Sequence, residues 1–184
     1  LLTWALERRY EKLTQHILDS GDEGLLRKLN FDFVNPGKLQ VLFRSLCAKD
    51  WSDAIEKIIK HPDKGDFILS KDDEGKTGFI VACNNGHINV VKLLLKQQLS
   101  NDIVLQQDNQ GENGFMKACQ NGQDEVVELL LKQANSQEII FSKNQQGENG
   151  FMKACQMGQR KVVELLLKQL NSREIISSKD QHGE

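Results

Sequence analysis

The chain has 184 residues, of which 24 are basic and 26 acidic, so its formal net charge is −2. Such a balance gives no overall field that would draw the chain to nucleic acid or to an acidic membrane surface. A membrane helix needs about 18 consecutive apolar residues. The longest aliphatic runs in this chain have only three residues, as at Leu93–Leu95, Leu129–Leu131 and Leu165–Leu167.

The chain repeats itself every 36 residues. GENGFMKACQ occurs twice word for word, at residues 111–120 and 147–156, and the four cysteines follow the same spacing: Cys47, Cys83, Cys119 and Cys155. A period in this range predicts a solenoid, because a single unit cannot bury its apolar face alone. We therefore expect one continuous all-α array in which each unit stacks on the next.

Two irregular units come first in the chain. Residues 1–35 predict a degenerate helix-turn-helix unit, and residues 36–71 predict a divergent one whose apolar positions precede those of the next unit by 36. The turn signal at Asn35-Pro36-Gly37 marks the joint between them. Asp50 stands where the later units carry a glycine.

Residues 72–107 form the clearest unit. After a tight turn, Thr77 is a candidate N-cap because its hydroxyl can accept a bond from a first-turn amide. Gly86 should end that helix in the left-handed conformation. A second helix follows, and its apolar stripe is wide enough to touch neighbours on more than one side.

Units 108–143 and 144–179 repeat this pattern, and residues 180–184 begin a further unit. Asn113 and Asn149 replace Thr77 as candidate N-caps. Gly122 and Gly158 occupy the position of Gly86, where we expect the helix to end. After each second helix, Ser100, Ser136 and Ser172 indicate an extra capped turn. The isoleucine and valine residues that follow should tuck this connection onto the stack.

The unit resembles an ankyrin repeat, with its Asp-x-x-Gly turn, a Thr-Gly-Phe-Ile stretch in place of Thr-Pro-Leu-His, Gly86-His87, and a Val-Val-x-Leu-Leu-Leu helix. The resemblance implies an all-α solenoid with hairpin-like connecting turns. The family proline is replaced by Gly78, Gly114 and Gly150, and each unit is longer than the family's usual length of about 33 residues.

The chain carries no visible catalytic or metal site. Structural zinc sites use closely spaced cysteine pairs, whereas every gap here is 36. Equivalent positions on stacked helices lie too far apart for disulfides, so we expect all four cysteines to be buried free thiols. His87 occupies a structural slot of the family. We therefore predict no enzyme activity, no metal and no cofactor.

The resemblance implies that the hairpin tips and the ends of the first helices line a concave groove that binds a partner. This surface is rich in amides and mildly acidic, without the aromatic and basic groups of a nucleic-acid site. The candidate partner-binding residues are Asp73, Glu74, Lys76, Asn84, Asn85, Asn109, Gln110, Glu112, Gln120, Asn121, Gln145, Gln146, Glu148, Gln156 and Met157.

We therefore predict a non-catalytic protein-interaction module or scaffold that binds a polar or basic protein segment and contacts neither nucleic acid nor membrane. One alternative is the cytosolic ankyrin arm of an ion channel or another membrane protein. A second is the substrate-recruiting region of an enzyme such as a kinase or ubiquitin ligase, and self-association is a third. We expect an excerpt of a larger intracellular, cytoplasmic protein.

Overall fold

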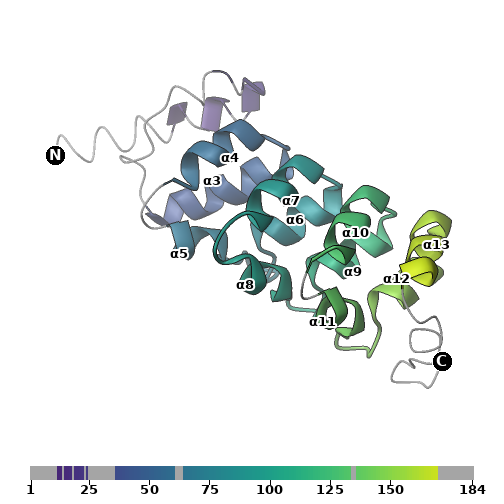
Figure 1. Cartoon of the computed structure of the whole chain (residues 1–184). Helices are drawn as coiled ribbons and strands as arrows, with labels where there is room; N and C mark the ends of the chain where they lie inside the picture. The colour runs from purple at the N-terminus through teal and green to yellow at the C-terminus, as the bar shows by residue number, and fades with distance from the viewer. Residues whose placement is uncertain are drawn as a thin grey trace.

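The computed structural model of the chain describes residues 36–60, 64–133 and 136–169, with short pieces between residues 12 and 24. The named elements in these three ranges are all helices (Figure 1). They are α3 (Pro36–Ala48), α4 (Ser52–Ile58), α5 (Lys64–Ile68), α6 (Gly78–Asn85), α7 (Ile88–Leu95), α8 (Ser100–Leu105), α9 (Gly114–Gln120), α10 (Asp124–Leu131), α11 (Ser136–Phe141), α12 (Gly150–Gln156) and α13 (Arg160–Gln169).

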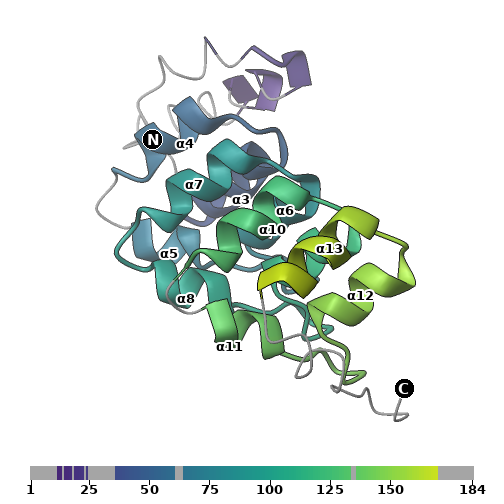
Figure 2. The same ribbon diagram turned by 45° about the vertical axis from the view of Figure 1, so that its right-hand side comes forward.

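The helices stack in three parallel rows (Figure 2). Helices α3, α6, α9 and α12 form one row, in which each packs on the next, and α4, α7, α10 and α13 form a second row beside it. The short helices α5, α8 and α11 follow one edge of the stack. Each first helix and each second helix therefore contacts its counterpart from the adjacent unit, as the repeat period predicts.

The predicted helix caps are confirmed. Thr77 Oγ1 accepts a bond from the Ile80 amide at 3.3 Å, and Asn113 and Asn149 do the same in α9 and α12 at 2.9 and 3.0 Å. The predicted stop glycines Gly86, Gly122 and Gly158 have φ values of 77°, 70° and 67°. In the last two cases the helix ends two residues before its glycine, and Asn121 and Met157 are the C-caps.

Asp50 takes the same left-handed conformation that glycine takes in the later units, with φ of 59°. It is the one non-glycine residue with positive φ in the described part of the chain. Its Oδ1 atom is buried and has no hydrogen-bond partner among the described residues. The backbone geometry at the end of the first helix is therefore retained at this position despite the unfavourable residue.

Glycines at the start of α6, α9 and α12 allow successive helices of the first row to approach closely. A Cβ atom built on Gly78 would lie 2.8 Å from Phe43 and from Cys47 Sγ, and one on Gly114 would lie 2.9 Å from Cys83 Sγ. These distances are too short for real carbon atoms. The phenylalanine and cysteine of one unit thus occupy the space that a proline or alanine side chain would need in the next.

The short third helices pack on the stack through the predicted apolar pairs. Ile103 and Val104 of α8 are buried, as are Ile139 and Ile140 of α11. The expectation of a serine cap is wrong for α8, which begins at Ser100 itself, and its N-cap Leu99 makes no side-chain hydrogen bond. Acidic residues in the first turn complement the helix dipole instead.

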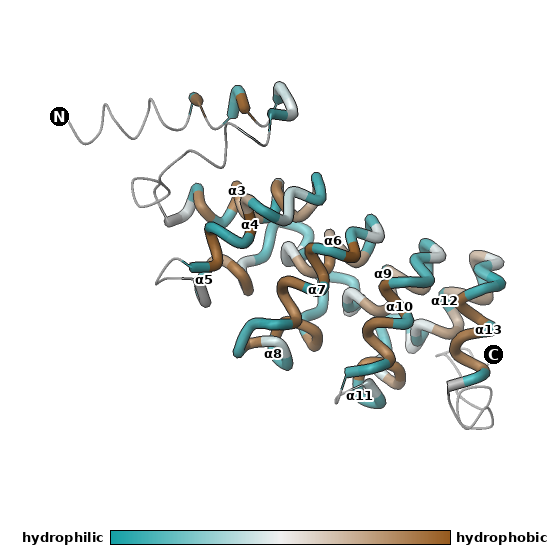
Figure 3. The backbone as a smooth tube through the Cα atoms, turned by 45° about the horizontal axis from the view of Figure 1, so that its top comes forward, coloured by the Kyte–Doolittle hydropathy of each residue, from teal (hydrophilic) through white to brown (hydrophobic). Residues whose placement is uncertain are grey.

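Hydrophobic residues concentrate within the helices, whereas hydrophilic residues gather at the helix ends and in the connecting turns (Figure 3). No helix in the described ranges is long and apolar enough to cross a membrane. The degenerate unit at residues 1–35, the turn at Ser172 and the unit beginning at residue 180 lie largely or wholly outside the described residues.

Candidate functional site

The turns that precede α6, α9 and α12 are joined into a continuous row, here called the tip row, comprising residues 72–76, 108–112 and 144–148. The Asn109 amide donates to Glu74 O at 2.9 Å, and the Gln145 amide donates to Gln110 O at 3.0 Å. The side chains of Asn109 and Gln145 add bonds to Asp73 O and Asn109 O at 2.8 and 2.9 Å. Each turn is therefore held against the next by both backbone and side chain.

The first two turns of the tip row enclose a shallow depression of about 260 Å³. Its lining residues are Asp73, Glu74, Lys76, Asp108, Asn109 and Gln110, so the structure brings five of the candidate residues together here. Lys76 forms an ion pair with Glu74, whose hydrogen bond, together with nearby carboxylates, raises the pKa of Lys76. The exposed wall of the depression carries more acidic than basic groups.

The ends of the first helices form a second row, here called the amide row, comprising Asn84, Asn85, Gln120, Asn121 and Gln156. Asn121 Nδ2 donates to Asn84 Oδ1 at 2.9 Å, so two candidate residues bind each other across α6 and α9. Behind them, His87, Gln123 and Gln159 each contact the main-chain carbonyl of the preceding unit, at 3.0, 3.1 and 3.0 Å. The expected structural role of His87 is consistent with its contact to Ala48 O.

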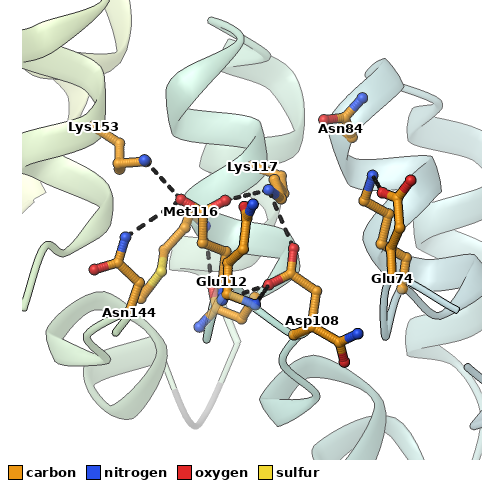
Figure 4. Close-up of polar contacts among 12 residues, drawn as sticks. Glu74, Asn84, Asp108, Glu112, Met116, Lys117, Asn144 and Lys153 are labelled. Atoms are coloured by element: carbon orange, nitrogen blue, oxygen red, sulfur yellow. Dashed lines mark hydrogen bonds and ion pairs between the residues drawn. The ribbon is translucent and has the colours of Figure 1, made fainter. Parts of the chain in front are cut away.

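Glu112 differs from the other candidate residues because it is buried. Lys153 Nζ lies 2.7 Å from its Oε1 atom, and Lys117 binds Oε2 (Figure 4). Lys117 also pairs with Asp108 at 3.2 Å. The candidate residue Glu112 is therefore not at the surface, because the two lysines of the duplicated segment cover its carboxylate. The side chains of Asp108, Glu112, Lys117 and the half-buried Lys153 pack together as a network of ion pairs, here called the buried ladder.

The ladder continues to Glu148, which pairs with Lys153 at 3.3 Å and accepts bonds from Gln156 and Asn144 at 2.6 and 2.9 Å. The amide donors of Gln156 and Asn144 lower the pKa of Glu148, together with Lys153 and against partial burial. At Glu112, burial opposes ionisation, but the bonds from Lys117 and Lys153 outweigh it and hold its pKa below the ordinary value.

The remaining candidates lie where a partner could reach them. Gln146, Gln156 and Met157 are exposed, as are Asn85 and Asn121, while Gln120 is half-buried. Met157 is 55% exposed and is the largest apolar side chain on this surface. Lys117 and Lys153 are ladder residues that the sequence analysis missed, although their position five residues after Glu112 and Glu148 was a usable signal.

Three of the cysteines are buried, as expected, but Cys155 is exposed, so the expectation is wrong there. Cys47, Cys83 and Cys119 each lie beneath the first glycine of the following helix. No described helix supplies such a glycine over Cys155. Within the described ranges, no cluster of histidine, cysteine or acidic residues could hold a metal ion.

The outer face of the second helices carries a contact between an acidic and a basic residue of adjacent units. Lys161 Nζ lies 3.5 Å from Asp124 Oδ2, and the lysine side chain is 83% exposed. An ion pair this exposed contributes about 0 to 1 kcal/mol. The contact is therefore a minor feature, and the buried ladder is the main electrostatic link between adjacent units.

The stacked helices and joined turns define a helical-repeat solenoid. An ankyrin-repeat profile (three copies) matches residues 42–140 and, in a second overlapping match, residues 97–180. The chain belongs to the ankyrin-repeat family, whose repeats generally mediate protein–protein interaction and are generally not catalytic. No curated protein matches the sequence.

Proposed function

We propose that this chain is a protein-interaction module that binds a polar or basic protein segment along the tip row and the ends of the first helices. The observation that carries the proposal is the depression between the first two turns, which the candidate residues line. Asp73 and Glu74 give it a negative rim, and Asn109 and Gln110 supply amide groups. Such a surface complements a lysine or arginine side chain carried on a polar segment.

The buried ladder supports this assignment, because its charged groups already bind one another and only the exposed residues of the tip row are available to a partner. Glu112 and Glu148 are already bound by lysines, so a partner would gain little from them. Asp73, Gln110 and Gln146 are exposed and lie on the same row. Fewer residues are therefore expected to contact the partner than the sequence analysis listed as candidates. Glu112 supports the structure of the surface instead of contacting the partner.

Selection of a random peptide library on the purified full chain tests the proposal. We expect the retained peptides to be rich in lysine and arginine. The double substitution Asp73→Ala with Gln110→Ala should weaken their binding by about tenfold or more, equivalent to about 1.4 kcal/mol. Rising salt concentration should weaken binding of the same peptides, because the attraction is between exposed charges.

Glu128→Gln provides a matched control on the outer face of α10, where Glu128 is exposed and pairs with Lys132. Peptide binding should be unchanged in this variant, and urea unfolding should confirm that both variants remain folded. Retained peptides without basic residues would count against the proposed partner chemistry. Equal affinities for the tip variant and the wild type would count against the proposed surface.

A further inference from the structure

Four asparagines in the chain are followed directly by glycine: Asn85, Asn113, Asn121 and Asn149. The structure places these identical dipeptides in two contrasting environments. Asn113 and Asn149 cap α9 and α12 and are only 0% and 1% exposed. Asn85 and Asn121 lie at the ends of α6 and α9 and are exposed.

An asparagine that precedes glycine can lose its side-chain amide in water. The glycine nitrogen bonds to the asparagine Cγ, the Cγ–Nδ2 bond breaks, and Nδ2 leaves as ammonia with the proton from the glycine nitrogen. Water then opens the five-membered imide at either carbonyl and gives aspartate or isoaspartate. Glycine permits the attack because it has no Cβ to obstruct the approach.

The cap positions block this reaction. Asn113 Oδ1 is held by the Met116 amide at 2.9 Å, which fixes the side chain away from the nitrogen of Gly114. Gly114 is itself packed so closely on Cys83 that even a Cβ atom would not fit. Asn149 is held in the same way by the amide three residues later, at 3.0 Å. Ring closure here would require the helix start to unfold.

At the helix ends the side chains are held only by exposed bonds: Asn85 Oδ1 accepts from Asn84 Nδ2 at 3.0 Å, and Asn85 Nδ2 donates to Ala48 O at 3.4 Å. The amide of Gly122 donates a long bond to Cys119 O, at 3.4 Å. The amide of Gly86 is shared between Ala82 O and Cys83 O, and its bond to Cys83 O is 3.3 Å long. Terminal turns open at a much smaller free energy than buried helix starts. Asn121 is in contact with Asn84 through Nδ2, which is the leaving group, so its Cγ atom remains open to attack.

We propose that Asn85 and Asn121 are sites of spontaneous conversion to aspartate and isoaspartate in the folded protein, and that the fold protects the two cap asparagines. Each conversion places a carboxylate where a neutral amide stood on the amide row. Isoaspartate also lengthens the backbone by one methylene at the helix end. At Asn121 the product loses the N–H that donates to Asn84 Oδ1. The modification therefore makes this surface more acidic and loosens one contact between α6 and α9.

Incubation of the folded full chain in mildly alkaline buffer, followed by proteolysis and mass spectrometry, tests the proposal. Acid should accumulate at residues 85 and 121 more than about tenfold faster than at residues 113 and 149, because exposed helix ends open at a smaller free energy than buried helix starts. A parallel incubation in urea removes the fold, and there all four sites should react at similar rates since each is followed by glycine.

All four asparagines are in the same chain and the same buffer, so the buried pair, Asn113 and Asn149, is an internal control for the exposed pair, Asn85 and Asn121. Equal rates at all four sites in the folded chain would show that the fold gives no protection and would overturn the proposal. Absence of acid at residues 85 and 121 in the folded chain would overturn it as well. Neither result depends on which partner the amide row binds.

Discussion

Lys153 of α12 donates a hydrogen bond to Glu112, with 2.7 Å between Lys153 Nζ and Glu112 Oε1. Glu112 lies in the turn before α9, so this ion pair joins α12 to the turn of the preceding unit. Lys117 binds the other oxygen of the same carboxylate. One buried carboxylate therefore bridges two lysines, and removal of its charge affects both.

We expect Glu112→Gln to lower the free energy of unfolding by about 1.5 to 3 kcal/mol, the range for hydrogen bonds to charged groups. The substitution leaves Lys117 and Lys153 partly buried without their shared counter-charge. Urea unfolding followed by circular dichroism measures the loss. Glu128→Gln removes an exposed ion pair with Lys132 and should cost at most about 1 kcal/mol. Equal small losses in both variants would contradict the ladder.

The ladder also predicts acid sensitivity. The pKa values of Glu112 and Glu148 in the folded state lie below the ordinary value of 4.5. Their contribution is therefore complete above that pH and is lost as the pH falls through the folded-state pKa values. Unfolding of the wild type and of Glu112→Gln across acidic pH should show the difference between them shrinking below 4.5. A constant difference would disprove the linkage.

The sequence predicted local features well because their causes lie within a few residues. A cap residue such as Asn113 needs only the amide three positions later, and a stop glycine needs only its own backbone. The apolar pair of α8 was predicted because the 36-residue period carries it into α11. The same period also places Phe67 and Ile68 of α5 before that pair, a match that the sequence analysis overlooked.

The sequence could not predict which polar residues are buried, because burial depends on neighbours from other units. Glu112 and Gln110 are close in the same turn, yet only Glu112 is covered, by lysines that extend from two helices. Cys155 has the same local sequence as Cys119. Cys119 is buried because Gly150 of α12 packs against it, whereas no described helix packs against Cys155 in this way.

Gly114→Ala should destabilise the array even though alanine favours helices. The new Cβ would lie 2.9 Å from Cys83 Sγ and 3.0 Å from Phe79, so the row of first helices would have to separate. Overpacking of this kind costs about 1 to 3 kcal/mol, partly offset by a gain of at most about 1 kcal/mol in helix propensity. Urea unfolding measures the net loss. A more stable variant would show that close packing does not require glycine here.

Asp50→Gly should stabilise the protein by about 1 kcal/mol, because the backbone at this position is left-handed and favours glycine. The substitution also removes a buried carboxylate oxygen without a partner among the described residues. Thermal and urea unfolding both report the gain. Asp53→Gly, within the first turn of α4, should instead destabilise. A loss of stability in Asp50→Gly would mean that its side chain has a compensating role.

A thiol reagent at neutral pH should modify one cysteine in the folded chain and all four in urea. Cys155 is exposed, whereas Cys47, Cys83 and Cys119 are buried. Burial raises the pKa of these three thiols far above the ordinary value, so almost none of the reactive thiolate forms. Mass spectrometry of the labelled peptides identifies the site, and Cys155→Ser should abolish rapid labelling. Rapid modification of Cys83 or Cys119 in the folded chain would contradict the packing of these sulfurs beneath the glycines of the next helix.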